Sequence, residues 1–298
     1  MNIGIVGLGR MGQAITWRLL QHNIQPFGYD PNEQSRQDFA ALGGIPTTSL
    51  SSLAQKASII WVMVPAGKPV DDVIEQLLTT LPPQAIIIDG GNSHYQDSKR
   101  RAAQLAARTI NFIDCGTSGG IHGRENGFSL MIGGDATIVQ QLDPLFKALA
   151  TPQGYGHFGP AGAGHYVKMI HNGVEYALLQ AYAEGFHLLH NGSYDNIDLE
   201  KVCSVWAHGS VVRSWIVELA QNIFKEDQTL ETVSGFIDEN KTGQWTQEEA
   251  ALHNIPVKTI ELALQTRAWS RQTGGNYATK IVALLRNQFG GHAVKSTK

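Results

Sequence analysis

The chain has 298 residues, of which 42% are hydrophobic and 16% are charged, and its formal net charge is -3 at pH 7. This composition is typical of a globular protein with a sizeable core, and the length allows about two domains. The slightly negative charge gives no electrostatic basis for binding nucleic acid or an anionic membrane surface.

No stretch approaches the roughly eighteen apolar residues that cross a bilayer, so we expect no membrane partner. The chain opens directly on an apolar strand candidate, without the basic segment of a signal peptide, and we expect a cytoplasmic protein. Its two cysteines, Cys115 and Cys203, lie far apart without metal-type spacing. We expect them to be reduced, buried thiols, and we expect no metal site.

The first part of the chain alternates apolar strand candidates with helical patterns. The strand candidates are residues 3–6, 25–29, 59–64, 85–89 and 109–114, with two further candidates near 129–132 and 155–158. Helical patterns cover residues 11–21, 70–78 and 98–107. Strands that alternate with helices predict an α/β fold with a Rossmann-type, doubly wound parallel sheet.

A glycine-rich stretch over residues 159–164 marks the predicted domain boundary, because the pattern changes after it. Helical periodicity then covers residues 165–190, 198–207, 211–224, 246–252, 256–272 and 276–286. We therefore predict a dinucleotide-binding Rossmann domain over residues 1–163 and an all-α domain over residues 164–298. The second domain is expected to bind substrate and to form an oligomer.

The first strand candidate runs directly into a GxGxxG motif, which consists of Gly7, Leu8, Gly9, Arg10, Met11 and Gly12. Between a strand and a helix, the three glycines permit a tight turn, the close approach of a pyrophosphate and close helix–strand packing. The helix N-terminus offers amide donors to the phosphates. We predict that these residues bind a dinucleotide; a glycine turn that binds nothing is the less favoured alternative.

Asp30 follows the second strand candidate, eighteen residues after Gly12. A carboxylate at this point can accept hydrogen bonds from both hydroxyls of the adenosine ribose, and it would repel a 2′-phosphate. The next residues, Pro31, Asn32 and Glu33, supply no cation to offset that repulsion. We therefore predict NAD as the cofactor in preference to NADP.

Two further strand ends are expected to border the cofactor. Val64, Pro65 and Ala66 end the third strand candidate, and Asn92 follows the fourth. Ligands of open α/β sheets bind at the carboxyl ends of the strands. Asn92 is placed to contact either the nicotinamide riboside or the substrate, although a simple turn residue explains it equally well when it is taken alone.

The predicted helix over residues 165–190 carries a stripe of groups that can move protons or donate hydrogen bonds, namely Lys168, His171, Asn172 and Glu175. Such a stripe suits proton transfer to a small polar molecule, whereas the alternative is an ordinary solvated helix face. The helix has few charges, and an opposite apolar stripe includes Val174 and Leu178. We therefore expect a largely buried helix, in which a lysine and a glutamate are rare unless paired or functional.

Four segments together resemble the 6-phosphogluconate dehydrogenase family, namely residues 7–12, 89–93, 116–120 and 164–176. The resemblance covers nearly the whole chain in order, and the set from Lys168 through His171, Asn172 and Glu175 to Tyr176 distinguishes this family from its relatives. It implies oxidative decarboxylation of 6-phosphogluconate to ribulose 5-phosphate and CO2, with reduction of NAD, in the pentose phosphate pathway.

The resemblance also implies roles for individual residues. Lys168 would be the general base and Glu175 the acid that protonates carbon 1 of the enediol left after CO2 departs, with Asn172 in the same catalytic set. The implied substrate contacts are Asn92, Ser118, Gly119, Gly120, His171, Asn172, Tyr176, Arg267, Arg286 and His292. Among these, Tyr176 and Arg267 would bind the phosphate, and Arg286 and His292 would reach into the site of a partner subunit. The resemblance thus implies a homo-oligomer, a dimer or a tetramer, with a site shared between subunits.

This chain departs from the family pattern in two ways. It resembles the short form of the family, so the oligomer geometry of the long form does not transfer to it. Residues 240–245 resemble the family's phosphate loop, but Lys241 is shifted by one place. Whether Lys241 or another group contacts the phosphate is therefore left open.

Two other functions remain alternatives. An NAD-dependent 3-hydroxyacid dehydrogenase of the wider β-hydroxyacid family, acting on an unphosphorylated acid, would share the nucleotide motif, the Ser-Gly-Gly turn and the catalytic lysine. It would not share the pair Glu175 and Tyr176 or the tail from Arg286 to His292. A non-catalytic nucleotide sensor would need neither Lys168 nor Glu175.

Overall fold

The computed structural model describes residues 2–239 and 241–297 and divides the chain into two compact units, Met1–Met169 and Ile170–Lys298. The division falls inside one continuous helix, α9 (Ala163–Asn191). The domain boundary expected at residues 163 and 164 lies at the start of that helix. Each unit is described by itself below.

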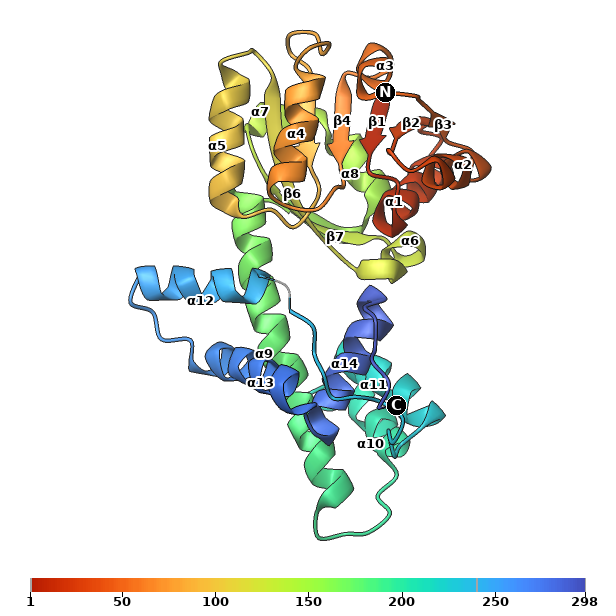
Figure 1. Cartoon of the computed structure of the whole chain (residues 1–298), viewed down its shortest axis with the longest axis vertical. Coiled ribbons are helices and arrows are strands. Elements are labelled where there is room, and N and C mark those ends of the chain that lie inside the picture. Colours follow the sequence, from red (N-terminus) through yellow and green to blue (C-terminus); the bar gives the residue numbers. More distant parts are fainter. Residues whose placement is uncertain (1, 240, 298) are drawn as a thin grey trace. The chain divides into compact units, whose positions relative to one another are not determined.

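The first unit contains one eight-stranded sheet with the strand order β3-β2-β1-β4-β5-β6-β7-β8 (Figure 1). The strands are β1 (Ile3–Val6), β2 (Pro26–Tyr29), β3 (Ile45–Pro46), β4 (Ile59–Val62), β5 (Ile86–Asp89), β6 (Asn111–Ser118), β7 (Phe128–Gly133) and β8 (Ala150–His157). Neighbouring strands run parallel, except that β6 and β7 are antiparallel. The chain runs from β1 to β2 and β3 on one side and then crosses to β4 on the other side of β1, which creates the switch point where such sheets bind ligands.

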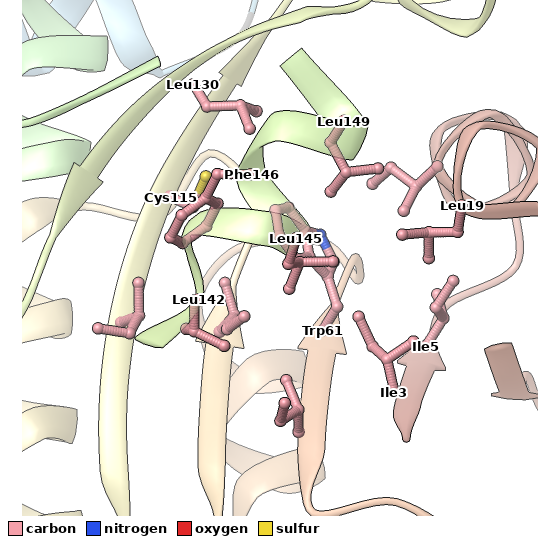
Figure 2. Packing of buried hydrophobic residues seen from close by; sticks show 14 of the residues in the cluster. Ile3, Ile5, Leu19, Trp61, Cys115, Leu130, Leu142, Leu145, Phe146 and Leu149 are labelled. Atoms are coloured by element: carbon pink, nitrogen blue, oxygen red, sulfur yellow. The ribbon is translucent and has the colours of Figure 1, made fainter. Parts of the chain in front are cut away.

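Helices cover both faces of this sheet, which confirms the predicted doubly wound fold. They are α1 (Arg10–Gln21), α2 (Glu33–Ala41), α3 (Leu50–Lys56), α4 (Lys68–Leu77), α5 (Tyr95–Ala106), the 3-10 turn η1 (Gly120–His122), α6 (Gly123–Asn126), α7 (Ala136–Gln141) and α8 (Asp143–Leu149). One face packs on α1 and α8, and Figure 2 shows Leu145 at Trp61 and Phe146 at Cys115 within this cluster. The central strands β1 and β4 are buried on both faces, so their sequences are continuously apolar rather than alternating.

Several short elements of the first unit were not predicted, and they share a cause. The helices α2, α3, α6, α7 and α8 and the two-residue strand β3 are too short for a clear hydrophobic period. Strand β6 also continues to Ser118, beyond the predicted end at residue 114, because its second half pairs with β7. That extension places the Ser-Gly-Gly turn at the end of a strand.

The second unit is helical, as predicted. After α9 it contains α10 (Leu199–Ala207), α11 (Trp215–Glu226), α12 (Thr242–Leu252), α13 (Lys258–Thr273) and α14 (Tyr277–Gly290). Its core joins Leu179, Ala183 and Phe186 of α9 to residues of α10, α11 and α14. An isolated bridge between Val233 and Ser296 ties the C-terminal segment to the loop after α11.

Both cysteines are free and buried, as expected, and burial raises the pKa of the Cys115 and Cys203 thiols. They are therefore protonated, unreactive core residues at neutral pH.

In the part of the chain that the structure describes, no helix is long and apolar enough to cross a bilayer.

Candidate functional site

The GxGxxG loop has the geometry that a dinucleotide requires. Gly7 has φ +90°, a conformation that favours glycine, and a β-carbon on Gly12 would overlap the Gly7 carbonyl oxygen. A β-carbon on Gly9, by contrast, would meet no atom within 4 Å. Gly9 is the N-cap of α1 and makes no side-chain cap, so open space lies at the positive end of this helix. The loop therefore leaves room for a pyrophosphate at the helix N-terminus, and the binding of one by these residues stays a prediction.

Asp30 lies beside this loop at the end of β2. Its Oδ2 accepts a hydrogen bond of 2.8 Å from the amide of Leu8, and its Oδ1 accepts one of 2.9 Å from the amide of Asn32. These bonds hold the carboxylate next to the glycine turn while leaving further lone pairs for ribose hydroxyls.

The structure adds a cation that the sequence argument missed. Arg36, in α2, donates hydrogen bonds of 2.6 and 3.1 Å to the carbonyls of Asp30 and Pro31. This role of Arg36 was not predicted, because α2 itself was not predicted. The helix turns its first-turn residues back toward the end of β2. Its guanidinium binds these backbone carbonyls rather than the Asp30 carboxylate.

The ends of β4 and β5 are joined by a buried ion-pair network that was not predicted. Arg101, in α5 and fully buried, donates to Asp89 at 3.1 Å, to Asp71 at 2.7 Å and to the carbonyl of Gly67 at 3.0 Å. Ser93 donates to the same Asp89 oxygen at 2.6 Å. Because Gly67 follows the predicted cofactor residues Val64, Pro65 and Ala66, the network ties that loop to the loop that carries Asn92.

The Ser-Gly-Gly turn lies at the same edge of the sheet. Gly119 has φ +121° and Gly120 has φ +53°, so the turn needs glycine at both positions. Thr117, just before it, donates a 3.1 Å hydrogen bond to the carbonyl of Gly90. This bond holds the turn of Ser118 beside the β5 loop, and both segments follow the carboxyl ends of neighbouring strands.

Lys168 is buried, with 6% of its surface exposed, and its stem packs on Gly116 of β6. The first turn of α9 is fixed by Asp114, which accepts hydrogen bonds of 2.6 Å from the amide of Gly162 and 2.8 Å from that of His165. The His165 ring is bonded to Ser98 at 2.7 Å. The helix start and the lysine stem are thus anchored to the sheet edge that carries the predicted cofactor residues.

The remaining stripe of α9 lies in the second unit. His171 Nδ1 is 3.1 Å from Asn172 Oδ1 and 4.0 Å from Glu175 Oε2. Asn172 is 7% exposed, and the side chain of Glu175 is 24% exposed. Together with Lys168, these groups occupy one run of α9, as helical spacing predicted.

The expected burial of this helix is partly wrong. Val174 and Leu178, from the apolar stripe, are 47% and 44% exposed, while Asn172 and Tyr176 are buried. Asn172 and Tyr176 therefore turn inward, whereas Val174 and Leu178 turn outward. Tyr176 can do so because Thr242 of α12 and Arg267 of α13 contact it, and the periodic pattern alone does not say which stripe faces the core.

Tyr176 stands at the centre of a cationic cluster. The guanidinium carbon of Arg267, on α13, lies 3.4 Å from the centroid of the Tyr176 ring, and Thr242 Oγ1 lies 3.2 Å from its hydroxyl. Arg267 is 3% exposed, and none of its three guanidinium nitrogens has a hydrogen-bond partner among the described residues. Burial lowers the pKa of Arg267 to about 10, and the positive charge of Arg286 acts in the same direction.

The last implied phosphate contacts are on α14, on the segment after it and on α12. Arg286 is 5% exposed and its pKa is lowered by burial, against the attraction of Tyr176, Asp238 and Glu175. His292 packs edge-on against Phe289, with 6.4 Å between the two ring centroids.

Lys241 is the exposed N-cap of α12. Thr242, and not Lys241, is therefore the loop residue that contacts Tyr176. Asn240 lies outside the described residues.

Both units of the chain match models of known protein families. The NAD binding domain of 6-phosphogluconate dehydrogenase matches residues 2–173, and the C-terminal domain of 6-phosphogluconate dehydrogenase matches residues 164–296. The chain belongs to the 6-phosphogluconate dehydrogenase family. It is an oxidoreductase of this family, and its first unit is an NAD-binding domain.

Among the described residues, no group of three or more His, Cys, Asp or Glu could hold a metal ion.

Individual relatives support the same assignment. A Haloferax volcanii protein named NAD(+)-dependent, decarboxylating 6-phosphogluconate dehydrogenase is 42% identical, over 99% of this chain and 98% of its own length. The decarboxylating enzyme of Cunninghamella elegans is 34% identical over 90% of this chain but only 59% of its own length. The solved 6-phosphogluconate dehydrogenase of Plasmodium falciparum superposes with a TM-score of 0.84 and 27% identity, over 91% of this chain and 62% of that one.

Proposed function

We propose that this protein oxidises and decarboxylates 6-phosphogluconate to ribulose 5-phosphate and CO2, with NAD as the acceptor. The observation that carries the proposal is the buried guanidinium of Arg267, which stacks on the Tyr176 ring and whose nitrogens have no hydrogen-bond partner among the described residues. A buried charge without a partner is costly, and it persists where a ligand supplies the missing charge. A phosphate monoester, with two negative charges and several acceptor oxygens, suits such a site.

This observation favours a phosphorylated acid over the unphosphorylated 3-hydroxy acid of the alternative function. A substrate without phosphate would leave Arg267 buried and unpaired in the complex as well. The spacing along α9 also fits a sugar acid: Lys168 and Glu175 lie seven residues apart on one helix, and Tyr176 follows directly. The phosphate group would thus bind next to the acid, at the end of the stripe remote from the base.

In this proposal, Lys168 and Glu175 carry out the two proton transfers of the reaction. Lys168, as the neutral amine, takes the proton of the substrate's 3-hydroxyl as the carbonyl forms. When bound, NAD supplies the acceptor for the hydride that leaves carbon 3. The C1–C2 bond then breaks, CO2 leaves, and its electron pair passes through carbon 2 to the new carbonyl. Glu175 donates a proton to the former carbon 2 of the enediol, which is carbon 1 of the product, and this completes ribulose 5-phosphate.

Asp30 supports NAD rather than NADP in this proposal. Its carboxylate lies beside the loop that fits the pyrophosphate, held there by the amide of Leu8. Arg36 is engaged with the carbonyls of Asp30 and Pro31, so it is not directed to a 2′-phosphate. The Haloferax volcanii relative, which is NAD(+)-dependent by name, is consistent with this choice.

The test is an assay of the purified protein with 6-phosphogluconate and, separately, with gluconate and 3-hydroxyisobutyrate, each with NAD and with NADP. Reduced nicotinamide is followed by absorbance and CO2 by trapping from 1-labelled acid. We expect both products in equal amounts from 6-phosphogluconate with NAD. Turnover of an unphosphorylated acid at the higher kcat/KM, or nicotinamide reduction without CO2, would assign the protein to the alternative.

A further inference from the structure

The first turn of α9, from which Lys168 follows, packs on the backbone of the sheet. A β-carbon on Gly164 would lie 2.4 Å from the carbonyl oxygen of Met131 and 2.7 Å from the amide nitrogen of Gly133. On the side of β6, the buried carboxylate of Asp114 accepts hydrogen bonds from two amides at the helix start. These contacts fix where the helix begins. Because all of them lie at its first residues, they leave the direction of the helix to its side chains.

A second set of contacts joins the same turn to α5. The His165 ring is 1% exposed, and its Nδ1 lies 2.7 Å from the hydroxyl of Ser98, which is fully buried. The rings of Tyr166 and Tyr95 meet edge to face with 5.2 Å between their centroids. A β-carbon on Gly162 would lie 2.9 Å from the Tyr95 carbonyl oxygen, so the loop before α9 also touches α5 closely. Figure 1 shows the first turn of α9 beside α5.

The helix α5 is in turn fixed to a loop that is predicted to border the cofactor. Arg101 lies three residues after Ser98 on this helix, and residues at that spacing are neighbours on a helix surface. Its guanidinium donates to the carbonyl of Gly67, in the loop after β4, at 3.0 Å. A continuous series of contacts therefore runs from this loop through Arg101, Ser98 and His165 to the helical turn that carries Lys168.

The pair of Ser98 and His165 is a poor device for stability alone. The Nε2 atom of His165 is buried and has no hydrogen-bond partner among the described residues. A buried polar atom whose hydrogen bond is not made costs stability, and two apolar side chains of similar shape would avoid that cost. What an apolar pair cannot provide is direction, because a hydrogen bond between buried groups fixes both their separation and their orientation.

We propose that Ser98 and His165 are positioning residues for Lys168. Their hydrogen bond sets the direction in which α9 leaves the sheet, and it thereby places the lysine amine relative to the loops at the sheet edge. Neither residue is assigned a contact with substrate or cofactor. The proposal deepens the proposed function and rests on it for the role of Lys168 as the base.

The kinetic test compares variants that break the bond with variants that keep it. Ser98→Ala removes the hydroxyl, and His165→Gln moves the polar atoms from the place of Nδ1 to that of Nε2. Each should lower kcat with 6-phosphogluconate by about tenfold or more without raising the KM for NAD. His165→Asn, whose amide lies where Nδ1 lies, and Ser98→Thr should recover most of the lost rate. Ser51→Ala, which removes an exposed serine hydroxyl from α3, is the matched control.

A double variant separates positioning from stability. Ser98→Ala combined with His165→Leu replaces the polar pair by an apolar one, so the unfolding temperature should equal or exceed that of the wild type. The kcat of this variant should nevertheless stay as low as that of Ser98→Ala. A wild-type kcat in the double variant, whatever its unfolding temperature, would assign the pair to stability alone and overturn the proposal.

The closing experiment needs no turnover. Acetic anhydride is the probe, and peptide mass spectrometry gives the ratio of acetylation at Lys168 to that at Lys258, whose side chain is 83% exposed. The ratio should rise several-fold in Ser98→Ala and His165→Gln, because Lys168 is no longer held in its buried position, and it should return to the wild-type value in His165→Asn. An unchanged ratio in the first two variants would overturn the proposal. A wild type that fails to turn over 6-phosphogluconate would refute the proposed function, while the acetylation ratios would still decide whether the pair positions Lys168.

Discussion

Gly116 leaves the space into which the Lys168 stem packs: a β-carbon on Gly116 would overlap Lys168 Cβ and lie 2.8 Å from its Cγ. These atoms are close to the backbone of α9, so the lysine cannot swing aside without moving the helix. The residue that the proposed function makes the base is therefore positioned by the absence of a side chain on a neighbouring strand.

Replacing Gly116→Ala should therefore lower kcat by about 100-fold, the order expected when a catalytic group is displaced by roughly 1 Å. The affinity for NAD, measured by fluorescence titration, should stay unchanged. The matched control is Gly185→Ala, because Gly185 also lies on α9 and an added β-carbon there meets nothing within 4 Å. A fully active Gly116→Ala enzyme would show that the stem position does not matter.

Lys168→Met should lower kcat by about 10²- to 10⁴-fold, the usual contribution of a general base, while NAD still binds. Methionine keeps the length and apolar volume of the stem, so the packing on Gly116 should persist. Lys258→Met serves as the control, since the Lys258 side chain is 83% exposed. Wild-type turnover by Lys168→Met would remove this residue from the proposed role.

Asp30 can be tested with two variants that separate charge from structure. Asp30→Asn keeps an acceptor for the Leu8 amide but loses the negative charge, whereas Asp30→Ala loses both. We expect Asp30→Asn to shift the ratio of kcat/KM for NAD over NADP toward NADP by at least about tenfold, or about 1.4 kcal/mol. An unchanged ratio in both variants would mean that Asp30 does not face the ribose.

Arg267→Met should separate binding from stability. Loss of a buried, charge-assisted contact to the phosphate should cost about 2 to 5 kcal/mol of substrate binding, seen as a higher KM. The ligand-free protein should unfold at the same or a higher temperature, because the variant removes a buried charge that lacks a hydrogen-bond partner among the described residues. A large drop in the unfolding temperature would indicate instead that Arg267 stabilises the fold.

Arg101→Met should destabilise the first unit by about 3 to 5 kcal/mol in denaturant unfolding, because it leaves the buried carboxylate of Asp89 without its cation. The control is Arg100→Met, which breaks an ion pair with the same Asp71 but at a side chain that is 50% exposed. That loss should stay below about 1 kcal/mol. Equal effects of the two changes would contradict the importance of the buried network.

The effect of Arg101 should also depend on pH. Burial acts to raise the pKa of Asp71, but the hydrogen bonds from Arg101 and Arg100 outweigh it and leave the pKa lowered. The folded pKa is therefore below the unfolded value of 3.8, so this stabilisation is complete above that value and is lost as the pH falls through the folded pKa. The difference in unfolding free energy between the wild type and Arg101→Met should shrink accordingly when it is measured at pH 3 instead of pH 7.

The amino-acid sequence alone was sufficient to predict the features that depend on residue spacing within a single strand, turn or helix. The turn at Gly7, the strand-end position of Asp30 and the stripe from Lys168 to Glu175 each follow from the geometry of a single strand, turn or helix. The doubly wound sheet and the helical second half follow from repetition of such elements. The short helices were missed because one or two turns carry too little periodicity.

Only the tertiary structure decided which distant residues meet and which faces are buried. Tyr176 and Arg267 stack although they are far apart in sequence, Arg101 joins two loops, and Ile281 and Leu285 of α14 pack into the core of the second unit. Val174 and Leu178 are exposed although their pattern suggested a buried helix. The reason is physical: periodicity places residues on one stripe of a helix, but the partners that pack against that stripe come from other parts of the chain and are selected by the fit of the whole core.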